Sequence, residues 1–265
     1  MVLENINSPE DVKKLSLEEL NLLSGEMREA LLHRLSNHGG HFGPNFGMVE
    51  ATIALHYVFN SPEDKIVFDV SHQSYPHKML TGRKEAYLDP EKYDDVSGYS
   101  EPSESAHDHF VIGHTSTSVS LAGGLAKGRD LKGEKGNVIA VIGDGSLTGG
   151  MAYEALNNIG ASKSKLIVIL NDNGMSISPN IGGISRHLGS LRTSKGYLSA
   201  KSFVKNKIGA IPSVGKGIAQ GLADIKNDIK YTILERGGVL FEELGFTYFG
   251  PVDGHDLPAL EQTLR

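Results

Sequence analysis

Apolar residues recur at helical spacing near the start of the chain, one every three or four residues, which is the pattern of an amphipathic helix. Ser16 and Glu19, just before this stripe, form the sequence signature of a capping box. The helix is therefore expected to begin after Ser16 and to end before residues 37–40. A second helix is expected over about 48–59. The stripe consists of Leu20, Leu23, Met27, Leu31 and Leu35.

Short continuous apolar runs predict strands. The runs at 138–142 and 166–170 are apolar throughout, as expected of strands buried on both faces, and a third strand is predicted at 66–70. A helical stretch at about 150–159 separates the first two runs. Strand, helix and strand within about 35 residues form a βαβ unit, which predicts an α/β fold with a mostly parallel sheet flanked by helices.

The stretch from 176 to 217 is rich in Gly, Ser, Lys and Asn and has weak periodicity. It is predicted to be a long mobile excursion, because long segments of this kind are usually functional lids or disordered. No proline-rich linker divides the chain, so a single domain over 1–265 is expected. The chain stops inside a helical pattern that starts at Asp256, so this domain is expected to be incomplete at its C-terminus. The later elements are predicted to be a helix at 218–233, a short helix at 239–244, a strand at 246–249 and a helix from Asp256.

Composition narrows the class of protein. The chain has 265 residues and no cysteine, which excludes a disulfide framework, a cysteine-based zinc site and a cysteine nucleophile and fits a reducing compartment. A net charge of −6 argues against a basic nucleic-acid-binding domain. We expect neither a signal peptide nor a membrane span, because the longest apolar runs are far too short. Glycine is abundant, with 32 residues and no period.

A glycine-rich loop follows one predicted strand. Gly143, Asp144 and Gly145 come directly after the run at 138–142, at the edge where open α/β sheets bind ligands. Gly145 lets backbone approach a diphosphate, but Asp144 would repel that anion unless a hard cation such as Mg²⁺ lay between them. The next strand is followed by Asn171, Asp172 and Asn173. Because asparagine offers a neutral carbonyl oxygen, Asn173 is a candidate second ligand.

Other nucleotide-binding motifs fail on inspection. Thr148 stands where a dinucleotide-binding loop needs its third glycine. Five residues, not four, separate Gly209 from Gly215, and Gly217 stands where a P-loop needs Ser or Thr. The sequence therefore favours a Mg-diphosphate site over either alternative.

Histidines crowd the first half of the chain, nine of 11 lying between positions 33 and 114, which suggests acid–base work near pH 7. His41, His72 and His114 follow glycine or open a loop and are the better site candidates, whereas His33 and His56 fall in predicted helices as packing or surface residues. Pro76 interrupts His72 and His77, which argues against a zinc site on one helical face.

Six segments in order carry a family resemblance. They closely resemble the N-terminal part of the 1-deoxy-D-xylulose-5-phosphate synthase family, thiamine-diphosphate enzymes of the transketolase group, from about 15 to 265. The resemblance implies a thiamine-diphosphate-binding fold with three α/β/α layers. The segments are His41-Phe-Gly-Pro, Asp69-Val-Ser-His-Gln-Ser-Tyr-Pro-His-Lys-Met-Leu-Thr-Gly-Arg83, Gly113-His-Thr-Ser-Thr-Ser118, Gly143-Asp-Gly-Ser, Ile169-Leu-Asn-Asp-Asn-Gly-Met-Ser-Ile-Ser178 and Gly250-Pro-Val-Asp-Gly-His-Asp256.

The resemblance also implies roles for individual residues. His41 would face the substrate and move protons, and His72 would contact the cofactor; together with His114 they are the expected catalytic histidines. The implied Mg²⁺ ligands are Asp144, the side chain of Asn173 and the backbone carbonyl of Met175. The residues implied to line the diphosphate and thiazolium side are Gly113, His114, Thr115, Gly145 and Ser146.

The implied activity is that of a transferase. Pyruvate would lose CO₂ and join D-glyceraldehyde 3-phosphate to give 1-deoxy-D-xylulose 5-phosphate, a precursor for isoprenoid, thiamine and pyridoxal synthesis, in a cytoplasmic homodimer. Family members are more than twice as long, and their cofactor-activating glutamate lies in a later domain. This chain is therefore expected to need those domains, in cis or in trans, for activity. A transketolase-type subunit and a non-catalytic Mg-diphosphate module stay open as alternatives.

Overall fold

The structure is a computed structural model that describes residues 1–162, 164–175, 179–192 and 239–265. The chain forms two compact units, the first made of 1–171 with 252–265 and the second of 172–251. The expected single domain over 1–265 stays a prediction. Among the described residues, no helix is both long and apolar enough to cross a membrane.

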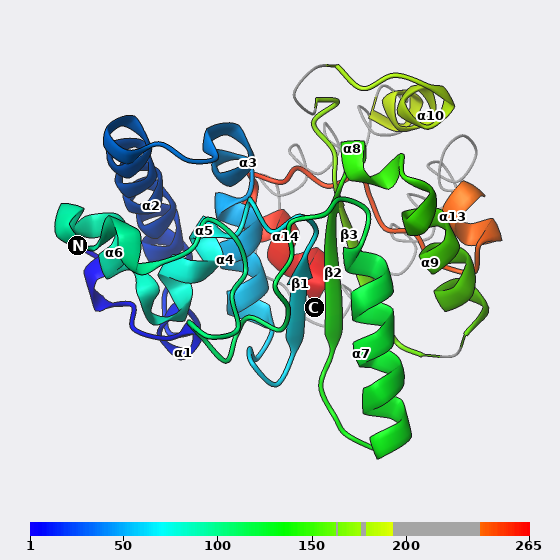
Figure 1. The fold of residues 1–265 in the computed structure, drawn as a ribbon, viewed down its shortest axis with the longest axis horizontal. Helices are drawn as coiled ribbons and strands as arrows, with labels where there is room; N and C mark the ends of the chain where they lie inside the picture. The colour runs from blue at the N-terminus through cyan, green and yellow to red at the C-terminus, as the bar shows by residue number, and fades with distance from the viewer. Residues whose placement is uncertain (163, 176–178, 193–238) are drawn as a thin grey trace, which may run out of the picture. The chain divides into compact units, whose positions relative to one another are not determined.

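The first unit contains most of the regular structure (Figure 1). Its elements are η1 (Leu3–Asn5), α1 (Pro9–Val12), α2 (Leu17–His38), α3 (Phe42–Phe46), α4 (Val49–Val58), β1 (Lys65–Phe68), α5 (Tyr75–Lys78), η2 (Met79–Arg83), α6 (Glu85–Leu88), η3 (Pro90–Asp95), α7 (Ser118–Lys132), β2 (Val138–Gly143), α8 (Asp144–Leu147), α9 (Gly150–Ala161), β3 (Ile167–Asn171) and α14 (Leu257–Leu264). The second unit contains α10 (Gly183–Arg192) and α13 (Val239–Glu243).

Three parallel strands form the described sheet in the order β1-β2-β3. Helix α9 connects β2 to β3, so the predicted βαβ unit and parallel sheet are confirmed. Strand β2 is buried over Val138 to Ile142, as its continuous apolar run predicted. Strand β3 is only partly buried, so the expectation that it would be buried on both faces is wrong for this strand.

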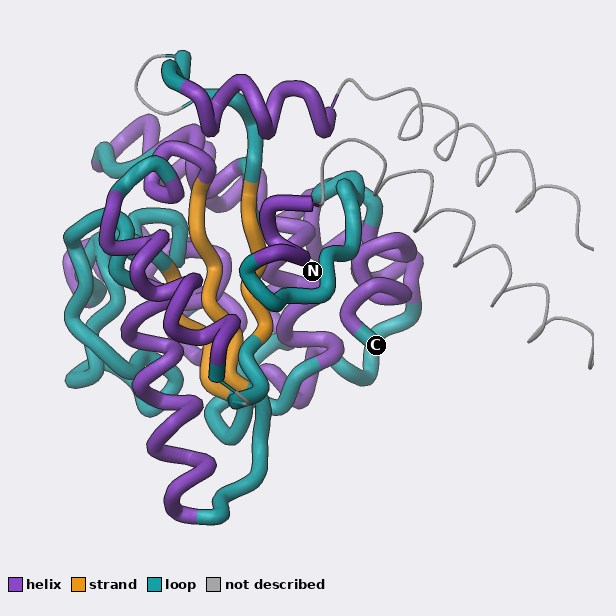
Figure 2. The backbone as a smooth tube through the Cα atoms, turned by 90° about the vertical axis from the view of Figure 1, so that its right-hand side faces the viewer, coloured by secondary structure: helices purple, strands orange, loops and turns teal. Residues whose placement is uncertain are grey.

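Helices lie on both faces of this sheet, as predicted. On one face, Ile139 and Val141 of β2 pack with Leu55 and Phe59 from the end of α4, and Leu264 of α14 packs against the same cluster. Helix α7 contacts β1 and β2 and lies on the other side of the strands. Figure 2 shows the strands running side by side between helices. The strand ends that carry the polar loops are thereby held from two sides.

The predicted capping box starts helix α2. Ser16 Oγ accepts the backbone N–H of Glu19 at 3.3 Å, and the Glu19 carboxylate accepts the backbone N–H of Ser16 at 2.7 Å. Each satisfies a helix-end donor that would otherwise lack a partner. The apolar stripe of α2 is buried in a cluster that also contains Tyr75, Tyr87 and Leu257. Through Tyr75, this cluster supports the segment 69–83, which carries candidate site residues.

Two late predictions are corrected. The stretch 246–249 is not a strand; it lies between Gly245 and Gly250, both at positive φ, and the N–H of Tyr248 donates to the Glu242 side chain instead of a neighbouring strand. Within the expected excursion, Gly183–Arg192 is helical, which corrects the loop prediction there. Residues 179–182 of the expected excursion are also described. The rest of the excursion lies outside the described residues, as does the predicted helix at 218–233. Helix α13 and helix α14, which Asp256 caps, are confirmed.

Gly25 and Gly136 should respond in opposite ways to substitution by alanine. Gly25 lies exposed in α2 with open space around it, so Gly25→Ala should raise the free energy of unfolding by about 0.5–1 kcal/mol. Gly136 has φ +101°, and a Cβ there would lie 2.7 Å from the backbone oxygen of Glu63. Gly136→Ala should therefore lower the free energy of unfolding by about 1–3 kcal/mol. Denaturant unfolding measures both; equal effects of the two substitutions would contradict this account.

Candidate functional site

Asp69 follows β1 and holds the entry to helix α7. Its side chain is buried, and its two carboxylate oxygens accept the backbone N–H groups of Ser116 at 2.9 Å and of Thr117 and Ser118 at 2.8 Å. Thr117, the N-cap residue of α7, makes no side-chain cap bond of its own. Asp69 therefore caps this helix from another element and fixes the loop 113–118 on the end of β1.

Left-handed backbone clusters at this edge of the sheet. Val70, Ser71 and Ser116 have φ of 58°, 65° and 68°, a conformation that non-glycine residues adopt only when their surroundings hold them. The side chain of Ser71 supplies part of that support, because its hydroxyl donates to the carbonyl of Ile112 and accepts the N–H of Ser100, both at 2.9 Å. Strain of this kind concentrates at functional sites.

The loop 113–118 touches the loop that follows β2. Ser116 Oγ donates to the carbonyl of Ser146 at 2.6 Å, and a Cβ on Gly149 would lie 2.1 Å from Ser116 Oγ. The structure thus brings together the loop 113–118 and the glycine-rich loop after β2, both of which belong to segments that the sequence singled out. Gly113, His114 and Thr115 are exposed on one loop, and Gly145 and Ser146 are half-buried on the other.

A second group of candidates surrounds Asn45. This fully buried side chain donates to the carbonyls of His41 at 2.7 Å and His72 at 2.8 Å and accepts the N–H of Tyr75 at 2.9 Å. The rings of His41 and His72 meet edge to face with centroids 5.3 Å apart. Two of the three predicted catalytic histidines therefore lie together, whereas His114 is exposed and lies outside this ring contact.

Burial keeps both of these histidines neutral near pH 7. Desolvation lowers the pKa of His41. It also lowers the pKa of His72, with the neighbouring His41 acting in the same direction and Asp69 opposing it. Within the described chain, His72 Nδ1 is buried without a hydrogen-bond partner. An orphaned buried nitrogen calls for a ligand or an ordered water.

The predicted metal ligands fall in both units. Asp144 is a buried carboxylate at the carboxyl end of β2, and Gly143 pairs with Asn171 so that β2 and β3 end level. In the second unit, Asn173 Oδ1 accepts the N–H of Met175 at 2.9 Å, and both residues are exposed. Carboxylate, amide and backbone carbonyl oxygens are ligand types that hard cations accept. The shared metal role of Asp144, Asn173 and Met175 stays a prediction.

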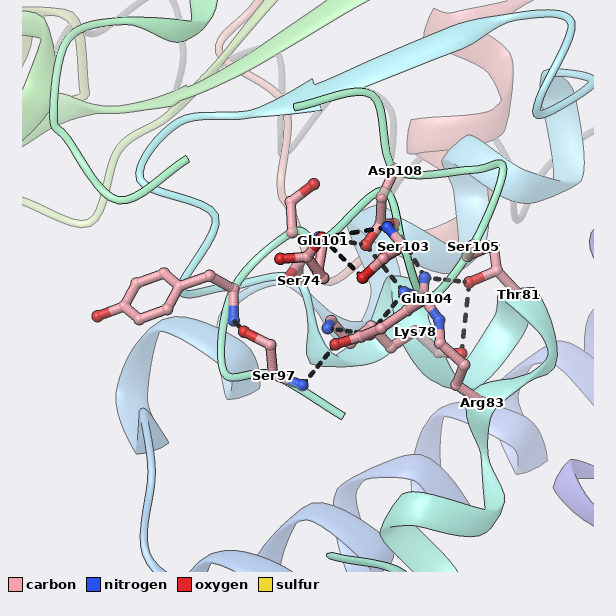
Figure 3. A network of polar contacts seen from close by, with 12 residues as sticks. Ser74, Lys78, Thr81, Arg83, Ser97, Glu101, Ser103, Glu104, Ser105 and Asp108 are labelled. Atoms are coloured by element: carbon pink, nitrogen blue, oxygen red, sulfur yellow. Dashed lines mark hydrogen bonds and ion pairs between the residues drawn. The ribbon is translucent and has the colours of Figure 1, made fainter. Parts of the chain in front are cut away.

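A further group of histidines belongs to a buried structural cluster. His56 Nε2 lies 2.9 Å from His77 Nδ1, and His77 Nε2 lies 3.1 Å from Asp108 Oδ1. Arg83 pairs with both Asp108 and Glu104, and the buried Lys78 also pairs with Glu104 (Figure 3). Most of the histidine crowding in the sequence therefore comes from one pair at the site and one cluster that anchors the segment 97–108.

Sequence reasoning missed Asp69 and Asn45. A signal for Asp69 was present, because it follows the apolar residues of a parallel strand as Asp144 does. Asn45 has no comparable signal, since its bonds reach residues up to 30 positions away.

A parallel sheet with two touching loops and a neutral histidine pair at its carboxyl edge defines an α/β ligand-binding domain. A family model described as 1-deoxy-D-xylulose-5-phosphate synthase matches residues 3–265. The chain belongs to the 1-deoxy-D-xylulose-5-phosphate synthase family.

Curated relatives with that description cover the whole chain. The chain is 52% identical over 264 residues to the one from Caldanaerobacter subterraneus subsp. tengcongensis. It is 50% identical over 265 residues to that of Brevibacillus brevis and 53% identical over 263 residues to that of Alkaliphilus oremlandii. These alignments cover 99–100% of this chain and 42% of each relative, so the chain spans less than half the length of the relatives it matches.

Asp69→Asn should loosen the entry to α7. The amide keeps one acceptor oxygen but turns an NH₂ group toward a backbone N–H, so we expect the free energy of unfolding to fall by about 2–4 kcal/mol. Hydrogen exchange should also lose protection at Ser116, Thr117 and Ser118. Asp64→Asn is the matched control, because Asp64 accepts two backbone N–H groups at the other end of the strands. Protection lost equally in both variants would refute the local role of Asp69.

Acid should destabilise the fold through its buried histidines. Burial lowers the pKa of His56, His77, His107 and His109 from 6.5, the latter two to about 4. Because the unfolded chain binds these protons first, stability is full above about pH 6.5 and falls as the pH drops toward 4. The thermal midpoint should therefore fall between pH 6.5 and 4.5, and less steeply in His107→Gln. A constant midpoint over this window would be the contrary result.

Proposed function

We propose that this chain is the thiamine-diphosphate- and Mg²⁺-binding part of an enzyme that condenses pyruvate with D-glyceraldehyde 3-phosphate to give 1-deoxy-D-xylulose 5-phosphate and CO₂. The observation that carries the proposal is the pair of loops joined by the Ser116–Ser146 bond beside the His41–His72 pair. Family membership supports the choice of reaction, because the curated relatives are described as synthases of that product.

The residues present suit this cofactor. Asp69 takes the N–H groups of Ser116, Thr117 and Ser118, which leaves the exposed backbone of 113–115 to meet phosphate oxygens. A Cβ on Gly113 would meet no atom within 4 Å, so there is open space beside this backbone. Asp144, Asn173 and the carbonyl of Met175 would hold Mg²⁺. The cofactor-side residues would be Gly113, His114, Thr115, Gly145, Ser146 and the orphaned Nδ1 side of His72.

Thiamine diphosphate, when bound, supplies the electron sink that lets a 2-oxo acid lose CO₂ and form a new carbon–carbon bond. The chain itself would orient the ligands. Asn45 fixes the backbone of His41 and His72, so both imidazoles are preorganised before a substrate arrives. His41 would face the substrate, and His114 would act from the exposed loop.

The proposed assembly is a cytoplasmic homodimer that includes the domains found in the remainder of the relatives. The lack of cysteine fits a reducing compartment. Residues of those domains would complete the substrate site, so the chain alone should bind the cofactor and show little turnover.

Calorimetry and a coupled assay test the proposal together. The chain should bind thiamine diphosphate only with Mg²⁺, and Asp144→Asn should weaken that binding by about tenfold or more, since metal-site groups commonly contribute this much. Asp95→Asn, at an exposed carboxylate in η3, is the control and should bind normally. With the remaining domains added, CO₂ should be released from pyruvate when D-glyceraldehyde 3-phosphate is present.

Each alternative has its own outcome. Turnover of xylulose 5-phosphate without pyruvate would identify a transketolase-type subunit. Cofactor binding with no activity even in the complete assembly would identify a non-catalytic module. If Asp144→Asn bound Mg²⁺ and cofactor normally, the metal assignment would be wrong.

A further inference from the structure

The imidazole of His41 lies between two tyrosine hydroxyls. Tyr75 Oη is 3.2 Å from His41 Nδ1, and Tyr99 Oη is 3.4 Å from His41 Nε2. The ring of His72 meets the same imidazole edge to face. Both nitrogens of His41 thus have a neutral partner that can donate or accept, and the direction of the hydrogen bond at Nδ1 follows from what else the Tyr75 hydroxyl contacts.

The surroundings of Tyr75 fix the direction at Nδ1. Tyr75 is 2% exposed, and its oxygen also lies 3.4 Å from the backbone nitrogen of His41, whose N–H donates to it. Among the described residues, the Tyr75 hydroxyl has no hydrogen-bond acceptor other than His41 Nδ1. A proton on Nδ1 would leave the Tyr75 oxygen facing two donors and its own proton buried without an acceptor, which is costly.

The Tyr75 hydroxyl therefore donates to Nδ1. A neutral imidazole that accepts at one nitrogen carries its proton on the other. The proton of His41 is thus on Nε2, on the side where the partly exposed Tyr99 accepts it.

We propose that Tyr75 is a positioning residue that holds His41 as the neutral Nε2–H tautomer, so that His41 serves the reaction as a hydrogen-bond donor and not as a base. The group it would meet is an oxygen acceptor, such as the carbonyl or carboxylate oxygen of a 2-oxo acid. This role in the reaction rests on the proposed function; the tautomer itself does not. In the chain without substrate, the Tyr99 oxygen takes the position of that acceptor.

Packing makes this arrangement rigid. Asn45 bonds both the carbonyl of His41 and the N–H of Tyr75, so one buried side chain sets the spacing between ring and hydroxyl. The guanidinium of Arg34 lies over the rings of Tyr75 and Tyr87, at 5.3 and 4.7 Å from their centroids. The Tyr75 oxygen is therefore held beside Nδ1 of His41 and cannot move toward another acceptor.

Nitrogen NMR of the ¹⁵N-histidine-labelled chain tests the proposal, with His41→Gln to assign the signals. At neutral pH, Nδ1 of His41 should show the chemical shift of an unprotonated nitrogen and Nε2 that of a protonated one. In Tyr75→Phe both shifts should move toward each other, because the two tautomers become mixed. Tyr87→Phe is the matched control: Tyr87 is equally buried, and its hydroxyl has no described partner, so the His41 shifts should not change.

Two results would overturn the proposal: a protonated Nδ1 in the wild-type chain, or unchanged His41 shifts in Tyr75→Phe. If Tyr75→Phe did not fold, the wild-type spectrum alone would decide. Thiamine-diphosphate calorimetry on the same sample separates the two claims. A chain that binds the cofactor but carries the proton on Nδ1 refutes the tautomer alone, and a chain with the Nε2–H tautomer and no cofactor binding refutes the proposed function alone.

Discussion

Asp69 joins the end of β1 to the start of α7, two parts of the chain that are distant in sequence. Its buried carboxylate is stabilised by three backbone N–H groups at the start of α7, and charge-assisted bonds of this kind offset the cost of removing a charge from water. Because the loop 113–118 is fixed here, Ser116 can reach the carbonyl of Ser146, and the left-handed residues Val70 and Ser71 are held between two anchored ends. The candidate site is built on this one ion.

Two sets of polar groups, Asn45 and the cluster around Asp108, position different parts of the site. Asn45 uses its two amide protons and its oxygen on backbone, so its contribution does not change with pH. The cluster around Asp108 uses charges, and the pKa of this carboxyl is held well below its usual range because hydrogen bonds from His77 and Arg83 outweigh its burial. Asn45 positions the His41–His72 pair. The cluster around Asp108 holds the segment 97–108, which brings Tyr99 to His41.

Local patterns in the sequence predicted the parts of the fold that depend on neighbouring residues. The capping box at Ser16 and the βαβ unit follow from spacing alone, and the rule that ligands bind at the carboxyl ends of parallel strands pointed to Asp144. The bonds of Asn45 could not be predicted, because they join segments that meet only after folding. The predicted strand at 246–249 failed for a related reason: its apolar residues suit a strand, but the flanking glycines and the Glu242 side chain give the backbone another conformation.

The contact between Gly149 and Ser116 has a consequence for how this site can change. No side chain fits at position 149 while a serine occupies position 116, so the two loops cannot vary independently. A larger residue on one loop requires a smaller residue, or a displaced backbone, on the other. The loops therefore have to be changed together, and transplanting either one alone into another scaffold would not carry its shape with it.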